Sequence, residues 1–172
     1  MLVLFAIGGC FVEANAGAGM WRSHTASGFL AQDGYIEDQS HSPSFDVGFV
    51  IGVAVDYDAA GFFVGVGASH DRGRERNATI ATAQARIDGT LYRAGTYRVR
   101  GTVVRQARSG PRGGGGDSFF GVTVARRTFA ASLGYRWARM DAENGKKDAA
   151  TYIETREGVQ MRIVWWISEW PR

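Results

Sequence analysis

The chain of 172 residues has few residues of several types that are common in enzymes and metalloproteins. Cys10 is its only cysteine, so an intrachain disulfide and a cysteine-based metal site are both excluded. The three histidines, His24, His41 and His70, lack metal-ligand spacing, and we expect no metal and no cofactor. Its only two lysines are adjacent, and the arginines are spread along strand-like segments. A nucleic-acid partner requires basic residues gathered on one surface, so we expect none.

Long apolar runs are also missing. The run Met1–Val12 is too short for a transmembrane helix and suits an export leader. One reading places a signal-peptidase site at residues 14–16, which gives a leader over 1–16 and a barrel domain over 17–172. A second takes residues 7–10, Ile-Gly-Gly-Cys, as a motif that resembles a bacterial lipobox, with Cys10 lipidated. A third reads this segment as a buried N-terminal strand. We expect export.

Strict alternation of residue types is strongest between Phe45 and His70. Over so many residues it predicts β-strands, because helical periodicity cannot produce it. A short turn at 58–61 joins two such arms into a hairpin. The same alternation predicts eight strands in all, at 17–31, 45–57, 62–70, 78–92, 96–107, 118–126, 129–140 and 158–168. Long polar loops are expected at 32–44 and 141–157, and a flexible glycine-rich loop at 108–117.

Alternating short turns and longer loops indicate an all-β fold, a single up-and-down antiparallel β-barrel of about eight strands. One face of each predicted strand is large and apolar, and the other carries glycine, alanine, serine and charges. A soluble barrel would show a water-facing surface rich in lysine, glutamate and glutamine. The composition of the second face suits the narrow interior of an eight-stranded barrel, which leaves the apolar face toward lipid.

The charged residues are consistent with this assignment. Eight of them fall on the predicted inner face and form a candidate lumen charge network: Asp46, Asp56, Arg86, Asp88, Arg98, Arg100, Arg136 and Arg162. Three aspartates are too few to pair all of these arginines, so some arginines should reach a rim or water. On the outer face, Arg105, Arg126 and Arg139 are predicted only at strand ends. Aromatic residues are expected at both edges of the apolar band, with Tyr57 and Phe62 among those near the short-turn end and Phe120 and Trp137 among those near the loop end.

In these features the chain resembles, over 17–170, the small eight-stranded outer-membrane barrels of Gram-negative bacteria. The resemblance implies an outer-membrane location, membrane lipid as a partner and a monomeric state. It also implies a structural or adhesive role without catalysis, with an extracellular ligand bound through the loops.

Two alternatives remain open at this point. The first is a soluble or lipid-anchored periplasmic barrel, similar to a lipocalin, whose apolar face lines a ligand pocket. The second is a lipid-modifying enzyme with its histidine and serine near the rim, either His70 with Ser69 or His41 with Ser40 or Ser42. Adjacent strand residues point to opposite faces, so His70 and Ser69 should not pair directly. We therefore assign no catalytic residue.

Overall fold

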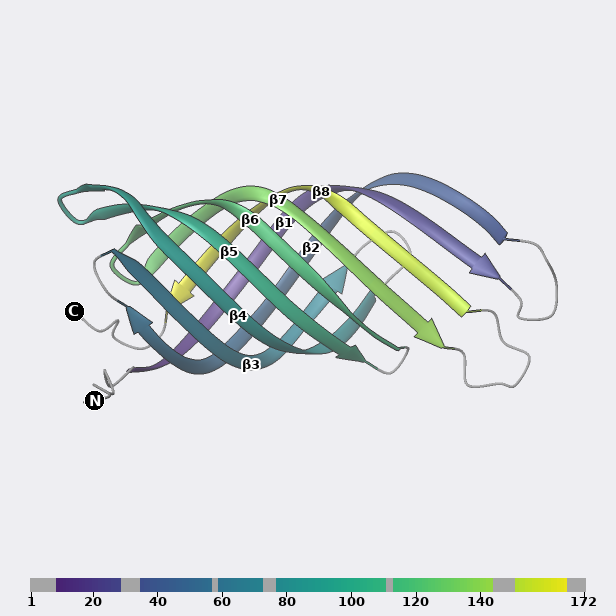
Figure 1. The fold of residues 1–172 in the computed structure, drawn as a ribbon, viewed down its shortest axis with the longest axis horizontal. Helices are drawn as coiled ribbons and strands as arrows, with labels where there is room; N and C mark the ends of the chain where they lie inside the picture. Colours follow the sequence, from purple (N-terminus) through teal and green to yellow (C-terminus); the bar gives the residue numbers. More distant parts are fainter. Residues whose placement is uncertain are drawn as a thin grey trace, which may run out of the picture.

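The computed structural model describes residues 9–28, 35–56, 59–72, 77–110, 113–143 and 151–166. They form one closed antiparallel barrel in which each strand pairs with the next and β8 pairs with β1, which confirms the predicted fold class (Figure 1). The strands are β1 (Gly9–Gly28), β2 (Tyr35–Asp56), β3 (Ala60–Arg72), β4 (Asn77–Ala94), β5 (Tyr97–Gly110), β6 (Gly113–Arg126), β7 (Phe129–Glu143) and β8 (Thr151–Trp166). Within these ranges, no helix is long and apolar enough to cross a membrane.

The barrel closes with a stagger that sets the height of every residue. Directly opposed partners can be followed from strand to strand once around the sheet. The row returns to β1 twelve residues beyond its start, from position 10 to position 22, through Cys10, Val53, Val64, Ala85, Arg105, Ser118, Trp137, Glu157 and Arg22. The strands are therefore strongly tilted, and residues on one row lie at steadily increasing heights from the short-turn end to the loop end.

Two tight turns lie at the short-turn end, shown at the left of Figure 1. Gly95 joins β4 to β5 with a φ of 57°, and Arg127 joins β6 to β7 with a φ of 50°. Left-handed backbone of this kind suits two-residue hairpin turns. A β-bulge between Thr90 and Tyr92 adds Leu91 to the outer face, so the β4–β5 hairpin has two consecutive exposed apolar residues at its end.

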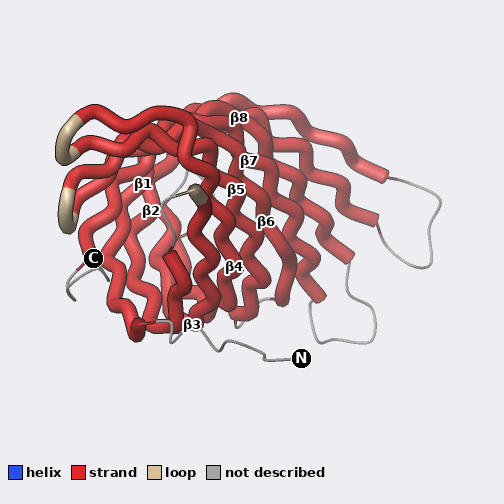
Figure 2. The backbone as a smooth tube through the Cα atoms, turned by 60° about the vertical axis from the view of Figure 1, so that its left-hand side comes forward, coloured by secondary structure: helices blue, strands red, loops and turns tan. Residues whose placement is uncertain are grey.

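The strands extend well into the segments predicted as long loops. β2 begins at Tyr35, β5 ends at Gly110, β6 begins at Gly113, β7 ends at Glu143 and β8 begins at Thr151. These polar and glycine-rich stretches carry turn signals, but each has a neighbouring strand that satisfies its backbone hydrogen bonds. The predicted loops at 32–44, 108–117 and 141–157 were therefore too long. β1, β2, β7 and β8 continue past the other strands at the loop end (Figure 2).

The first strand also differs from the prediction of a strand at 17–31. β1 begins at Gly9, and residues 9–16 pair with β2 along their whole length. Phe11 packs into the core with 3% of its surface exposed, and the side chain of Glu13 is fully buried. The predicted leader boundary after Ala16 consequently falls inside β1.

Paired glycines make room for a large ring in the lumen. Gly121 and Gly134 face each other across β6 and β7, and the ring of Phe119 lies over both. A Cβ added at either position would come within 2.7 Å of the Phe119 Cζ and closer still to backbone of the opposite strand. Phe119 itself is 1% exposed, so its ring cannot move out of the way easily.

Replacement of Gly134 by alanine should therefore destabilise the barrel by about 1–3 kcal/mol through overpacking. Gly89→Ala is the matched control, because a Cβ at Gly89 meets nothing within 4 Å. That control should stay within about 0.5 kcal/mol of the wild type. Urea unfolding of refolded protein in vesicles would measure both. Equal effects at the two positions would contradict the packing described for Phe119.

Candidate functional site

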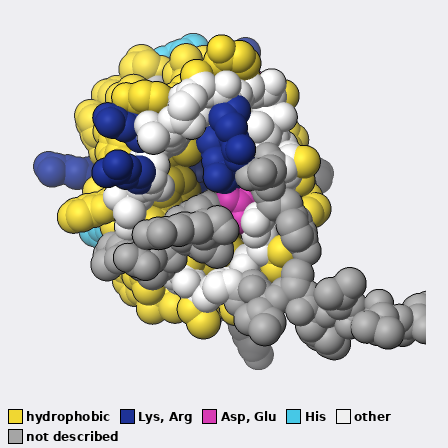
Figure 3. Space-filling view, turned by 90° about the vertical axis from the view of Figure 1, so that its left-hand side faces the viewer, with side chains coloured by type: hydrophobic (Ala, Val, Ile, Leu, Met, Phe, Trp, Pro, Cys, Tyr) yellow, Lys and Arg dark blue, Asp and Glu magenta, His cyan; other side chains and the backbone are white. Residues whose placement is uncertain are grey.

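The outer surface carries a continuous belt of exposed apolar side chains. The belt consists of Met20, Phe45, Val47, Phe49, Ile51, Val53, Phe62, Val64, Val66, Ile87, Val103, Phe120, Val122, Val124, Leu133, Tyr135, Trp137, Val159, Met161, Ile163 and Trp165, each at least 40% exposed. Seen from the short-turn end, hydrophobic side chains surround the periphery of the molecule, while an acidic side chain is visible in its middle (Figure 3). The apolar face thus lies outside the barrel, as the alternation predicts.

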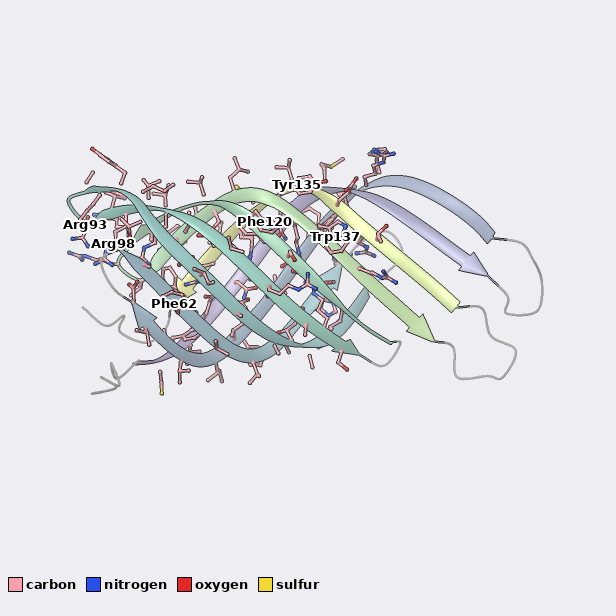
Figure 4. The ribbon with its side chains drawn as sticks, in the orientation of Figure 1. Phe62, Arg93, Arg98, Phe120, Tyr135 and Trp137 are labelled. Carbon is pink, nitrogen blue, oxygen red and sulfur yellow. The ribbon has the colours of Figure 1, made fainter. Side chains whose placement is uncertain are left out.

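Aromatic side chains lie at different heights along this belt. Phe62 is near the short-turn end, while Tyr135 and Trp137 are nearer the loop end (Figure 4). Phe120 lies between them, nearer mid-height than the loop-end position expected for it, because the stagger of the sheet displaces β6. Tyr57 falls outside the described residues.

One charged residue departs from the prediction for the outer face. Arg105 is four steps along the row from Cys10 and four steps from Arg22, so its backbone lies at the middle of the belt. The prediction placed it at a strand end because the stagger is not visible in the sequence. A cation held at this depth in lipid costs about 2–4 kcal/mol unless its charged group reaches an interface. Arg126 and Arg139 do lie toward the two ends.

The lumen of the short-turn half is filled by charged and aromatic groups. Arg86 donates to Glu13 over 2.7 Å and lies 3.3 Å from Asp88. Its guanidinium also stacks 3.9 Å from the centre of the Phe63 ring. Nearby, the buried carboxylate of Asp56 accepts hydrogen bonds from both Arg98 and Arg100. This half is closed by apolar side chains packed around it, which are Phe11, Val50, Ala54, Phe63, Ala130, Val164 and Trp166.

A second network fills the lumen toward the loop end. Arg136 donates to Asp117 over 2.6 Å and to Asp46 over 3.2 Å. Arg108 pairs with Asp117 and with Asp71. Arg162 lies 5.6 Å from the centre of the Phe119 ring and its charge acts on both Asp46 and Asp117, so it lies close to this network. All eight residues of the candidate lumen network are thus placed inside the barrel, and the structure divides them between the two networks.

The lumen holds more carboxylates than the sequence analysis expected, so its arginines are nearly matched by acidic side chains. The described lumen holds six carboxylates, on Glu13, Asp46, Asp56, Asp71, Asp88 and Asp117, and six guanidinium groups, on Arg86, Arg98, Arg100, Arg108, Arg136 and Arg162, with Arg156 as a seventh at its loop-end mouth. Buried charges are tolerated when they are paired and hydrogen-bonded, so this balance explains how so many fit inside.

Sequence reasoning missed Glu13, Asp71, Arg108 and Asp117, which it assigned to the leader or to loops. The signal that could have found them is the alternation itself. Asp71 and Asp117 have the same parity as the small inner residues of β3 and β6, and Arg108 continues the inner face after Gln106. If the alternation had been extended past the apparent end of each strand, these residues would have been predicted on the inner face.

A polar pocket lies at the loop-end mouth of the lumen. Arg72, Arg108, Arg136 and Arg156 line it together with Trp21, Ser44, Phe45, Asp46, Asp71, Ile80 and Ala138. The indole Nε1 of Trp21 and the hydroxyl of Ser44 are buried there without a hydrogen-bond partner. An acceptor, the Oδ1 of Asp71, is also unpaired there. Because four arginines line the pocket against two aspartates, donors still outnumber acceptors around it, which favours a ligand or solvent that supplies oxygen atoms.

The histidines do not form a catalytic arrangement in the described part of the chain. His70 lies exposed on the outer face with its Nδ1 3.1 Å from the Thr79 hydroxyl, while Ser69 is buried in the lumen. The two adjacent residues thus face opposite sides of the sheet. His41 is exposed on β2, and the side chains of His24, Ser40 and Ser42 lie outside what the structure describes. No group of three or more potential metal ligands is found among the described residues.

No protein-family model matches the chain, and no curated protein matches it either. Three solved structures are similar to it. The crystal structure of Neisserial surface protein A (NspA) shares 13% identity at a TM-score of 0.33, over 90% of this chain and 98% of that one. Outer-membrane expressed OmpT of Vibrio cholerae shares 14% identity at a TM-score of 0.29, over 90% of this chain and 52% of that one.

The third is Ail, the attachment invasion locus protein of Yersinia pestis, with 11% identity and a TM-score of 0.21 over 87% of this chain and 97% of that one. Because these identities and TM-scores are low, we transfer no activity or partner from these proteins. The function of this chain is therefore inferred from its own strands and side chains.

Glu13→Ala should destabilise the barrel by about 3 kcal/mol, because it leaves Arg86 buried with only part of its charge compensated. Replacing both residues, as in Glu13→Leu with Arg86→Leu, should recover much of that loss, since a buried pair can often be exchanged for apolar groups. Urea unfolding of Glu13→Leu, Arg86→Leu and the double variant gives the coupling energy of the pair. If the losses of unfolding free energy in the two single variants added up to that of the double variant, Glu13 and Arg86 would not be energetically coupled.

Proposed function

We propose that this protein is a non-enzymatic, integral outer-membrane β-barrel with a structural or adhesive role at its loop end. The observation that carries the proposal is the exposed apolar belt around a charged, filled lumen. Transmembrane barrels have this arrangement, apolar outside and polar inside. A monomeric soluble protein rarely exposes a continuous apolar surface of such extent.

The dimensions of the belt support this location. The stagger corresponds to twelve residues of rise along a tilted strand, which at strand geometry gives roughly 30 Å of height. This agrees with an apolar band of about 25 Å plus its flanking interfaces. The outward run of β2 from Phe45 to Val55 covers 11 residues, near the length that a tilted strand needs to cross a bilayer.

The lipocalin-like alternative requires an apolar interior that could receive a ligand. The described lumen instead holds paired charges, and its larger apolar side chains are packed against one another or under guanidinium groups. Eight strands leave an interior that side chains just fill, so a pore is not expected. The apolar surface is therefore available to lipid rather than to a small apolar molecule.

A role at the loop end is supported by two features of that end. Paired strands β1, β2, β7 and β8 project beyond the other strands and form a wall at one side of the mouth. The donor-rich pocket with Trp21 and Ser44 lies at the same end. In outer-membrane barrels the longer connections face the outside of the cell, which would present this surface to an extracellular ligand.

Processing is proposed to leave residues from Cys10 onward in the mature barrel. Removal of 1–16 would delete Glu13 and Phe11, leaving Arg86 without its shortest ion pair and opening the core. Cleavage at the lipobox-like motif would keep both residues. Lipidation of Cys10, which is exposed near the short-turn end, is compatible with this strand.

The membrane proposal is tested by two arginine substitutions at side chains of equal exposure but different depth. Val66 is 65% exposed at mid-belt, and Leu91 is 66% exposed at the short-turn end. In vesicles, Val66→Arg should cost about 2–4 kcal/mol and Leu91→Arg about 0–1 kcal/mol. Unfolding in urea would measure both. Equal and small effects, together with solubility without detergent, would indicate a water-facing surface and overturn the proposal.

The processing proposal is tested by the intact mass of the protein purified from outer membranes. We expect a mature chain that includes Glu13, with added acyl mass if Cys10 is lipidated. A mature chain that starts at Gly17 and still shows the heat-modifiable mobility of a folded barrel would contradict the role given to residues 9–16.

A further inference from the structure

Arg105 is the described outer-face charge whose backbone lies at the middle of the belt. It is directly opposite Ala85 on β4 and Ser118 on β6. Ionisable residues at such depth are rare and point to a function by default. Its role therefore depends on where the charged group goes and what it meets there.

The side chain of Arg105 runs toward the loop end. Its Nη1 donates to the Ser118 hydroxyl over 2.6 Å. Its Nη2 would lie 3.2 Å from a Cβ at Gly116, which is two residues nearer the loop end along β6. The guanidinium thus reaches up over Gly116 while its aliphatic stem stays within the belt, as long cationic side chains do at a membrane interface.

A second arginine stands at the point that this guanidinium reaches. Arg139 on β7 is directly opposite Gly116 and is exposed on the same face. Arg105 and Arg139 stand on β5 and β7 with β6 between them, so the reach of Arg105 over Gly116 brings its guanidinium toward the position of Arg139. An anionic oxygen group placed here would accept charge-assisted hydrogen bonds from both guanidinium groups.

The surroundings suit a lipid headgroup. Trp137 and Tyr135, 40% and 45% exposed, lie beside the arginines, and aromatic residues of this kind mark the interface of a bilayer. Glu157, the outward carboxylate of the same row, is hydrogen-bonded to Tyr135. Toward β4 the outer face carries only small side chains, at Ala81, Ala83 and Ala85, which leave the approach to Arg105 open.

We propose that Arg105 and Arg139, with the hydroxyl of Ser118 holding Arg105 in place, bind the phosphate of a membrane lipid on the outer face near the loop end. Guanidinium groups recognise phosphate through paired, charge-assisted hydrogen bonds. This site rests on the proposed membrane location, since only a lipid-facing surface would meet a headgroup there.

The test uses the full chain refolded into phosphatidylcholine vesicles, then transferred to mild detergent and titrated with phosphatidic acid, whose phosphate is not covered by choline. Native mass spectrometry counts the bound lipid. Arg105→Gln and Arg139→Gln should each weaken binding about tenfold, the loss expected for one charge-assisted hydrogen bond. The double variant should lose less than the product of the two, because both groups hold one phosphate.

Arg126→Gln is the matched control. Arg126 is exposed on the outer face of β6, the strand that carries Ser118, but it lies at the short-turn end, directly opposite Tyr97 and Phe129. This control should bind phosphatidic acid like the wild type. Equal losses in all three variants, or none in Arg105→Gln and Arg139→Gln, would overturn the site. Failure of the wild type to insert into vesicles would overturn the membrane proposal as well, whereas insertion with unchanged lipid binding would overturn the site alone.

Discussion

Closure of the sheet is the constraint on which the rest of this structure depends. A strand that faces lipid cannot leave backbone donors and acceptors unpaired, because hydrocarbon offers no hydrogen-bonding partner. The pairing of β8 with β1 removes the last open edge. It also requires β1 to begin early enough to meet β8, and Glu13, opposite Trp166, is the first residue of β1 in that pairing.

Closure with a stagger of twelve residues then determines where each charge can be placed. The interior of eight strands is narrow, so the charges that enter it lie within reach of one another. The chain fills this space with two networks of arginine and carboxylate groups, and Phe119, resting on the paired glycines Gly121 and Gly134, fills space alongside them. Pairing of this kind lets a barrel exclude water from its centre without leaving a buried charge uncompensated.

The same stagger accounts for the position of Arg105 on the outer face. A residue that would lie at a strand end in an unstaggered sheet is brought to mid-height, and its guanidinium then extends to the interface over Gly116. The absence of a side chain at Gly116 is what leaves this path open. The stagger thus determines both the pairing of charges in the lumen and the depth of Arg105 on the outer face. The loop-end pocket lies at the end where β1, β2, β7 and β8 extend past the other strands.

Residue alternation by itself determined the class of fold, the number of strands and which face is apolar, because the period of two is a local property of an extended chain. It also placed Asp46, Asp56, Arg86 and Arg100 on the inner face. Strand limits depended on tertiary structure, since polar segments such as 35–44 become strands only when a neighbour pairs with them. The ion-pair partners and the depth of Arg105 were decided by closure and stagger, which depend on the register between strands far apart in the sequence.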